Sequence, residues 1–475
     1  MTLFLKPLTP WLWPGLLCTL VGCGTPGIDV PSQQTTRAQD LRLSEAPSLA
    51  LPAQWWQSLG DPALDALVTT ALQGSPSMAT AQLRWQRMQA LSGVARAASS
   101  VQTSAGADLT RQRFSANGLY PRPIAGNIWD NDTVQANLSW SPDFWGQHAA
   151  EFAAAWGQTR AAQADAAAAR TLLASQVCKT YITLARLWAQ RDLAQRSLTQ
   201  KQTIHTLITA RQSAGLDTSW ERNPAEINIA EAQAQWEALQ EQIMLVRHQL
   251  AALTGQAPQA LDALQPKLTS LRLQALPAQL SADLLGRRPE VVASRWRVEA
   301  ASQDVAVART QFYPNLNLSA FVGFNALGLS HLLDAGSQQV GITPALRLPL
   351  FDGGRLQSQY ATRQSERDLA VAQYNQTVLD AVRETADAIG STQSLHKQMQ
   401  TQASALHTAE RQYALVQQRF DAGLVNALTV LATQNAVLAQ ERLYIDLKAH
   451  QLDNQVQLMK ALGGGWQDAT ATTDQ

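Results

Sequence analysis

One cysteine near the N-terminus has the sequence context that a covalent modification of its thiol requires. Cys23 is preceded by residues 20–22, of sequence Leu-Val-Gly, and an apolar stretch, residues 11–17, follows the basic Lys6. A positive charge, an apolar stretch and a small residue before the cut are typical of a secretory signal. We expect residues 1–22 to be a signal peptide, with cleavage before Cys23 and a diacylglycerol on its thiol, because the tetrad resembles a bacterial lipobox.

The alternative is an ordinary secretory signal with an incidental cysteine, because Pro7, Pro10 and Pro14 interrupt the apolar region. Gly24 follows the cysteine, and the absence of an aspartate there favours the outer membrane over retention in the inner membrane. Two or three acyl chains suffice for stable anchoring. We expect no cofactor beyond this lipid, and Cys178 is left as a free thiol.

No other group of residues has the spacing of a catalytic or metal site. Gly463–Gly465 follows an expected helix and opens none, so it indicates a helix stop and not a phosphate loop. The seven histidines are scattered without metal-ligand spacing, at positions 148, 205, 248, 331, 396, 407 and 450. We therefore expect neither an enzyme nor a metal protein.

The charge composition excludes one class of partner. Lysine and arginine number 37, aspartate and glutamate also 37, and a net charge of zero argues against a nucleic-acid partner. Charged residues make up 16% of the chain, against roughly 25% in ordinary soluble domains. A polar but weakly charged surface suits a water-filled passage.

The chain contains an internal repeat of a whole half-protein. Trp85 and Trp296 stand in similar contexts 211 residues apart, and Arg211–Leu216 is echoed 208 residues later by Arg419–Leu424. We assign residues 23–60 to a lipid-anchored, extended N-terminal segment and 466–475 to a flexible tail. The two repeats then cover 61–270 and 271–465. Such a duplication is too long for a solenoid repeat.

Each half begins with a helical stretch, about 61–98 and 281–310, and continues with a hairpin of strands, about 101–141 and 314–350. A long helical hairpin follows, about 143–254 and 354–462, whose first helix would extend roughly 100 Å. From Leu424 to Met459, mostly apolar residues recur at spacings of four and three, which predicts a coiled-coil seam against the preceding long helix. A cytoplasmic coiled-coil rod is the alternative.

Four segments alternate between apolar and polar residues. Residues 134–140, 315–320 and 340–348 do so clearly, and residues 101–106 only weakly. This pattern suits a membrane barrel with lipid-facing and lumen-facing residues, although a half-buried soluble hairpin has the same pattern. Four strands cannot enclose a channel, so we expect a homotrimer with twelve strands.

Several motifs together resemble those of the TolC family of trimeric outer-membrane channel proteins, particularly the NodT-like lipoprotein branch of tripartite efflux systems. They cover nearly the whole chain after the signal, in order: Trp55–Leu64, Asp143–Gly146, Asp283–Val291 with Phe312–Pro314, Leu348–Arg355 and Leu462–Trp466.

The resemblance implies a mainly helical α+β fold, in which a trimeric twelve-stranded transmembrane β-barrel continues into a long α-helical coiled-coil barrel. It implies a passive, gated conduit for small drug-like molecules, located in the outer membrane with a large periplasmic portion. The partners that the resemblance implies are a periplasmic adaptor protein and an inner-membrane pump of RND type. The alternatives are an exit duct for metal cations or type I secreted proteins, or a periplasmic scaffold lipoprotein that does not span the membrane.

The resemblance also implies roles for the two turns of the long hairpins. The tips that meet the adaptor would comprise Arg211, Gly215, Leu216, Arg419, Gly423 and Leu424, whereas the alternative for these residues is helix capping alone. A periplasmic gate would be formed by Asp217 and Asp421, each present three times around the axis. The alternative at the first turn is that Asp217 or Thr218 only caps the following helix.

Overall fold

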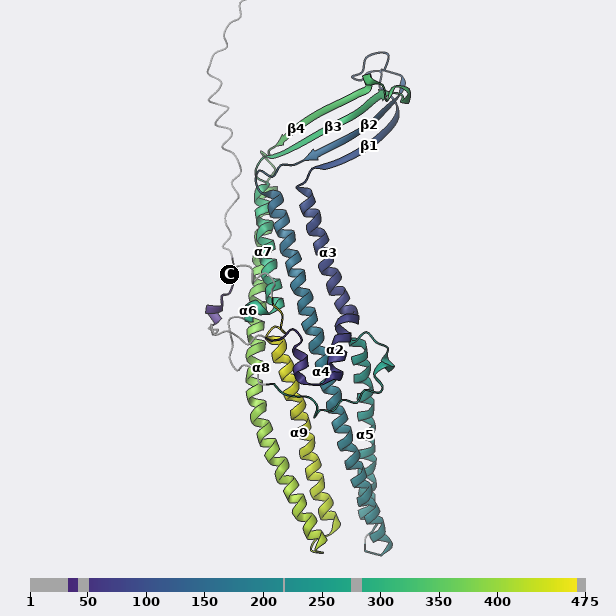
Figure 1. Cartoon of the computed structure of the whole chain (residues 1–475), viewed down its shortest axis with the longest axis vertical. Coiled ribbons are helices and arrows are strands. Elements are labelled where there is room, and N and C mark those ends of the chain that lie inside the picture. The colour runs from purple at the N-terminus through teal and green to yellow at the C-terminus, as the bar shows by residue number, and fades with distance from the viewer. Residues whose placement is uncertain (1–32, 42–50, 217, 275–283, 468–475) are drawn as a thin grey trace, which may run out of the picture. The chain divides into compact units, whose positions relative to one another are not determined.

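The computed structural model describes residues 33–41, 51–216, 218–274 and 284–467 (Figure 1). The expected signal peptide, Cys23 and Asp217 lie outside these residues. The chain divides into two compact units. The sheet unit contains Gln86–Ala161 and Ser294–Tyr374, and the helical unit contains Thr36–Trp85, Ala162–Ala293 and Asn375–Gln475.

The sheet unit is built on one antiparallel sheet to which each half of the chain contributes a hairpin. The first half supplies β1 (Gln102–Arg113) and β2 (Ile128–Trp140). The second supplies β3 (Asn315–Leu327) and β4 (Gln338–Arg347), and the strands follow one another in the order β1-β2-β3-β4 (Figure 1). The halves therefore join through the pairing of β2 with β3, which sets Ala136 opposite Val322.

Strand β1 is longer than its weak alternation indicated. All twelve of its residues are exposed, and each is paired with a residue of β2. Its extended conformation is thus imposed by the ladder with β2, since the local pattern of apolar residues gives little preference.

The two long helical hairpins have identical helix lengths, as the duplication requires. Helices α4 (Gln147–Ser213) and α8 (Arg355–Asp421) have 67 residues each. Helices α5 (Ser219–Leu253) and α9 (Ala427–Ala461) have 35 residues each. In the part of the chain that the structure describes, no helix combines the length and hydropathy that crossing a membrane requires.

The residues that start the long helices explain two of the sequence motifs. Gly146 and Gly354 have φ values of +76° and +86°, so α4 begins at Gln147 and not near residue 143 as the sequence predicted. The carboxylate of Asp143 accepts a hydrogen bond from the backbone N–H of Ala149 at 2.9 Å. Asp352 does the same for Leu356 at 2.9 Å, so each motif supplies an acceptor for the free N–H groups of the first turn.

Proline divides the two shorter helical stretches that the sequence predicted as single helices. Residues 61–98 form α2 (Pro62–Gly74) and α3 (Pro76–Ala98), with the break at Ser75. Residues 284–310 form α6 (Leu284–Arg287) and α7 (Pro289–Thr310), with the break at Arg288. Proline lacks the N–H that would continue the ladder, and it disfavours the helical conformation of the residue before it.

Arg288, at the second of these breaks, connects the start of α7 to α8. Its guanidinium is buried and donates to the carbonyl of Ala381 at 3.0 Å and to the carboxylate of Glu384 at 2.7 Å, both on α8. It also donates to Glu290 at 2.8 Å. One buried side chain therefore joins the start of α7 to α8, and its charge is balanced by two carboxylates.

The core of the helical unit includes the segment before the first repeat. That segment is not extended throughout, because Ala38–Leu41 and Trp55–Leu59 form short 3-10 helices and Trp55 and Leu59 are fully buried. Asp61 caps α2 by accepting from the N–H of Ala63, and it also accepts from the hydroxyl groups of Tyr181 and Ser270, at 2.9 and 2.8 Å.

Helix α9 packs on two neighbours, whereas the sequence predicted only α8. Asn454 donates to the carbonyl of Ala388 on α8 at 3.0 Å. On its other side, α9 meets α4, where Lys179 donates to Gln457 at 2.7 Å. The C-terminal members of the predicted seam, among them Leu452 and Val456, are buried in the core that includes residues of α4. The duplicated hairpins are thus joined through α4 and α9.

Candidate functional site

The turns that close the two long hairpins have the same backbone structure. Gly215 and Gly423 have φ values of +73° and +72°, a conformation that favours glycine. The N–H of Leu216 donates to the carbonyl of Arg211 at 2.9 Å, and that of Leu424 donates to the carbonyl of Arg419 at 2.8 Å. Each turn is therefore a Schellman C-cap, in which the arginine contributes its carbonyl.

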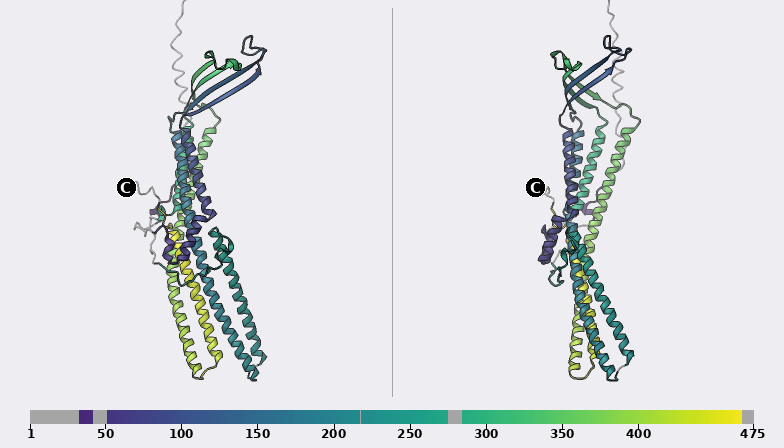
Figure 2. Two further views of the ribbon diagram at one scale, coloured as in Figure 1. Left: turned by 45° about the vertical axis from the view of Figure 1, so that its right-hand side comes forward. Right: turned by 90° about the vertical axis from the view of Figure 1, so that its right-hand side faces the viewer.

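These turns present apolar side chains to solvent. Leu216 is 67% exposed and Leu424 is 74% exposed. Both turns lie at the same end of the helical unit, at the bottom of Figure 1 and again in the views of Figure 2. Capping explains the glycines and the arginine carbonyls, and it favours an apolar residue directly after the glycine. It does not account for the large part of each leucine that stays open to solvent.

The sequence reasoning missed one residue of the first tip. Trp220 is 82% exposed in the first turn of α5. Its position four residues after Leu216, directly beyond the turn, is the signal that could have identified it. A tryptophan at this exposure adds apolar area that a partner protein can cover.

Polar side chains at the tips mainly begin and end helices. Thr218 caps α5 in a capping box with Glu221, whose carboxylate accepts from the N–H of Thr218 at 2.8 Å. Of the two residues that could cap α5, Asp217 and Thr218, it is therefore Thr218 that does so. In the second tip Asn426 caps α9 by accepting from the N–H of Thr429 at 3.0 Å.

Asp421, the expected gate residue of the second tip, is the last residue of α8 and is exposed. Its carboxylate accepts from the side-chain amide of Gln417 at 3.0 Å. It does not cap the next helix, which begins at Ala427. The structure therefore gives Asp421 no role in starting a helix.

Polar contacts between α4 and α9 hold the two hairpins together above the tips. Arg196 donates to both oxygens of Glu441, and Gln190 donates to Asp446 at 2.6 Å. Exposed pairs of this kind contribute about 1 kcal/mol or less each.

Asp453 on α9 is a half-buried carboxylate in the same interface. Burial raises the pKa of Asp453 to about 6, although the charges of Lys179, Arg186 and His450 act in the opposite direction. Its Oδ1 has no hydrogen-bond partner among the described residues. Nearby, burial raises the pKa of the Cys178 thiol, so this buried cysteine stays protonated and unreactive.

The four strands have one apolar face and one polar face. On the apolar face, Val322 pairs with Val340 and Ala320 pairs with Ile342, and Val340 is 78% exposed. On the polar face, cross-strand rows run from β1 to β4 and consist of amide, hydroxyl and glycine residues, with Phe321 as the exception. One row comprises Gly106, Gln135, Gly323 and Gln339, and the next comprises Ser104, Asn137, Phe321 and Gly341.

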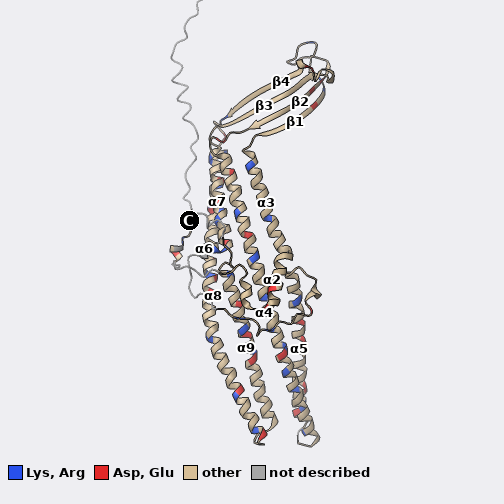
Figure 3. Cartoon of the chain, in the orientation of Figure 1, with Lys and Arg blue, Asp and Glu red and all other residues tan. Residues whose placement is uncertain are grey.

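Charges are nearly absent from the middle of the sheet (Figure 3). Apart from Arg347, the charged residues of the strands lie in the half next to the loops 114–127 and 328–337; they are Asp108, Arg111, Arg113, Asp130 and Asp132. Strand β3 has no charged residue. An apolar band with charges at its margin is the pattern of strands that cross a membrane.

Aromatic residues lie at the other end of the sheet, where the strands meet the helices of the same unit. The ring of Trp145 stacks on that of Tyr313 at 5.0 Å between centroids. The indole N–H of Trp145 donates to the carbonyl of Pro314 at 2.7 Å, directly before β3 begins. These contacts fix the start of β3 against the loop that precedes α4.

The described residues contain no group of three His, Cys, Asp or Glu side chains placed to hold a metal ion. Gly463–Gly465 lies against the helical core, with φ values between +58° and +93°. A side chain at Gly463 would clash with the carbonyl of Arg287, only 2.3 Å from the ideal Cβ position. Close packing and backbone conformation therefore explain these glycines. Trp466, at the start of the expected tail, is half-buried and donates its N–H to Gly463.

A duplicated chain with a two-faced sheet and two long helical hairpins is the architecture of outer-membrane channel proteins. The structure of VceC from Vibrio cholerae matches with a TM-score of 0.80 and 33% identity, covering 87% of this chain and 99% of that one. The CmeC outer membrane channel of Campylobacter jejuni matches with a TM-score of 0.82 and 21% identity, covering 94% and 96%.

The sequence agrees with the fold. The family described as outer membrane efflux protein matches residues 67–256 and 280–464. The multidrug resistance outer membrane protein MdtP of Shigella flexneri is 32% identical over 96% of this chain and 97% of its own length. MdtQ of Escherichia coli O6:H1, described in the same words, is 33% identical over 95% and 97%. The chain belongs to the outer membrane efflux protein family, and its location is the outer membrane.

Proposed function

We propose that three copies of this chain form a gated channel that exports small organic molecules through the outer membrane. The observation that carries the proposal is the two-faced sheet with two open edges. Strands β1 and β4 each have one neighbouring strand among the described residues. An open strand edge is strongly unfavourable in lipid, where no water satisfies its backbone groups.

Pairing β4 of one copy with β1 of the next removes both edges. Four strands are too few to enclose a channel, whereas twelve strands leave a lumen. The apolar face, with Val340 and Ile342, then meets lipid, and the polar face lines the passage. In this proposal, lipid on Cys23 anchors each copy to the outer membrane.

The described function of the relatives supports a proposal for the cargo, and the exposed side chains of the hairpin tips support one for the partners. Relatives such as MdtP are described as multidrug resistance proteins, which supports drug-like molecules as cargo. A passive channel needs an energy source elsewhere, so we assign an inner-membrane pump of the RND type and a periplasmic adaptor as partners. The exposed Leu216, Trp220 and Leu424 supply apolar contact area for that adaptor.

Conductance of the purified full-length protein tests the channel itself. We expect a trimer that resists dissociation in detergent until it is heated, and stable conductance steps when it is added to a planar lipid bilayer. A protein that is monomeric before heating, or that never conducts, contradicts the proposal.

The adaptor contact is tested by the double variant Leu216→Asp and Leu424→Asp, in a host strain that lacks its own channel but keeps pump and adaptor. The variant should form trimers and conduct in bilayers as the wild type does. Export of a fluorescent drug should fall severalfold, because two charges replace the apolar contact in every copy. Wild-type export by a conducting variant would show that the tips are not contact sites.

A further inference from the structure

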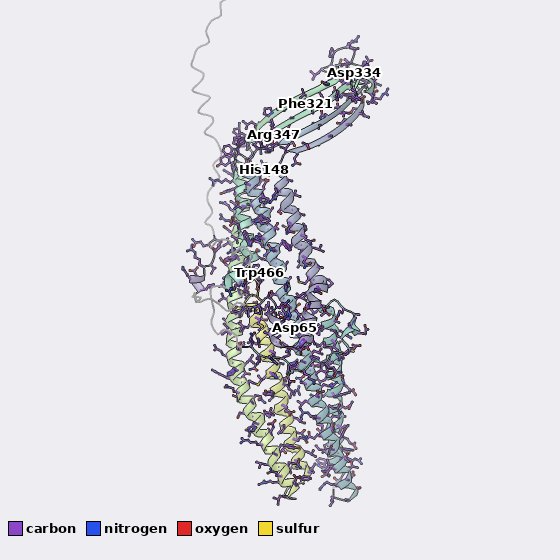
Figure 4. All side chains as sticks on the ribbon, viewed as in Figure 1. Asp65, His148, Phe321, Asp334, Arg347 and Trp466 are labelled. Carbon is purple, nitrogen blue, oxygen red and sulfur yellow. The ribbon has the colours of Figure 1, made fainter. Side chains whose placement is uncertain are left out.

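The polar face of the sheet carries one large apolar side chain in its middle rows. Phe321 lies midway along β3 (Figure 4), opposite Asn137 on β2 and Gly341 on β4. The other large apolar residues of this face, Trp129 and Leu327, lie near the loop ends of their strands. The neighbours of Phe321 on this face carry amide and hydroxyl groups, so a half-buried aromatic ring here is unexpected for a wall that only passes water.

The glycine opposite leaves room for the ring to lie flat on the sheet. An ideal Cβ at Gly341 would lie 2.5 Å from both Cε1 and Cζ of Phe321. The ring therefore covers the backbone of β4 with one side. Phe321 is half-buried, and no ring contact with another aromatic residue of the described chain involves it.

A chain of side-chain amides borders the ring. Gln339 donates to Gln135 at 3.0 Å, and Gln135 donates to Asn137 at 3.0 Å. The hydrogen bond between Gln339 and Gln135 crosses over Gly323, which lies between them in the sheet and has no side chain to obstruct it. The amides are thereby held beside the ring and bear no charge.

An aromatic ring beside fixed, uncharged amides matches the chemistry of a planar aromatic solute with polar substituents. Ring-on-ring stacking favours such a solute by about 0.5 to 1.5 kcal/mol beyond simple burial, which corresponds to roughly two- to tenfold in residence time. This is enough for brief retention but not for tight binding, as a conduit requires.

We infer that Phe321 and the amides of Gln135, Asn137 and Gln339 form a weak binding site for planar aromatic cargo, present three times in the channel. This inference rests on the proposed function, because only a closed barrel turns the polar face toward cargo. The role of Phe321 in covering Gly341 does not by itself require an aromatic residue.

Channel recordings on the full-length trimer test this inference, with (1-naphthylmethyl)trimethylammonium and its fully saturated decalin counterpart as probes. In the wild type, the aromatic probe should interrupt the current for roughly threefold longer than the saturated one. Phe321→Leu keeps an apolar cover over Gly341 but removes the ring, so the ratio should fall close to one while conductance remains. Phe321→Trp should retain or increase the ratio.

The matched control is Val322→Ala, next in sequence but on the apolar face, where 60% of the residue is exposed. This variant should keep the wild-type ratio of interruption times. Equal interruption times for the two probes in the wild type, or an unchanged ratio in Phe321→Leu, would overturn the inference and leave the channel function intact. A wild-type protein that does not conduct at all would instead contradict the proposed function.

Discussion

The charged residues of the helical unit fall into two groups with different physical consequences. Those at the hairpin tips, such as Asp421, are exposed and keep their hydration. Those between α4 and α9, such as Asp453, have lost much of it. In the proposed trimer the first group would be repeated around the axis, whereas the second group contributes to the free energy of folding.

As proposed gate residues, Asp217 and Asp421 should give the channel a preference for cations. Asp421→Asn combined with Asp217→Asn removes six negative charges from a trimer, so we expect the reversal potential in a salt gradient to move toward zero. Glu410→Gln, on α8 but away from the turn, should have a much smaller effect. An unchanged reversal potential in the double variant would exclude these residues from the gate.

Asp453 should make the stability of the helical unit depend on pH. Its pKa of about 6 in the folded protein exceeds the usual 3.8, so the folded state binds more protons between these values. Stability should therefore fall as pH rises from about 4 to about 6 and then stay level. Two pKa units correspond to about 2 to 3 kcal/mol.

Asp453→Asn should remove this pH dependence and raise the melting temperature of the trimer near pH 7.5. Melting curves between pH 4 and pH 8 check both effects. Asp387→Asn is the control, because that carboxylate is 66% exposed on α8 and its replacement should leave the slope unchanged. A wild-type slope retained in Asp453→Asn would be evidence against the argument.

At the level of elements, the sequence predicted the hairpins well because their signals are local. Where a helix begins and ends is determined by three local features: a glycine that adopts positive φ, a capping residue, and an uninterrupted run of helix-forming residues. Gly215 and Gly423 were identified in this way. The breaks at Ser75 and Arg288 were missed, although Pro76 and Pro289 marked them.

The need for glycine in the turns can be tested by comparing Gly423, in the turn after α8, with Gly390 inside α8. Gly423→Ala places a side chain at a φ of +72°, which costs about 1 to 2 kcal/mol even though the space around it is open. Hydrogen exchange at the N–H of Leu424 should become at least fivefold faster. Gly390→Ala, within α8 and also in open space, should leave that exchange unchanged or slow it.

At the scale of the whole molecule, assembly depends on which face of the sheet meets lipid. Ile342 and Thr343 are neighbours on β4, both exposed, and lie on opposite faces. Ile342→Arg should cost about 2 to 4 kcal/mol per copy in the membrane, whereas Thr343→Arg should be tolerated in the lumen. The yield of heat-dissociable trimer from outer membranes measures the difference, and equal yields would contradict the assignment of the faces.

The sequence by itself determined the duplication, the two long hairpins, the glycine turns and the family, because these depend on residues that are close in the chain or on motifs in a fixed order. Only the tertiary structure decided which residues of distant segments meet. The weak alternation of β1 became a full strand through its pairing with β2, and α9 gained α4 as a second partner. The register of β2 on β3 set Phe321 beside Asn137, and the packing of α9 on α4 buried Asp453. Which of these distant residues meet depends on the free energy of the whole folded chain, and a local sequence pattern carries no information about it.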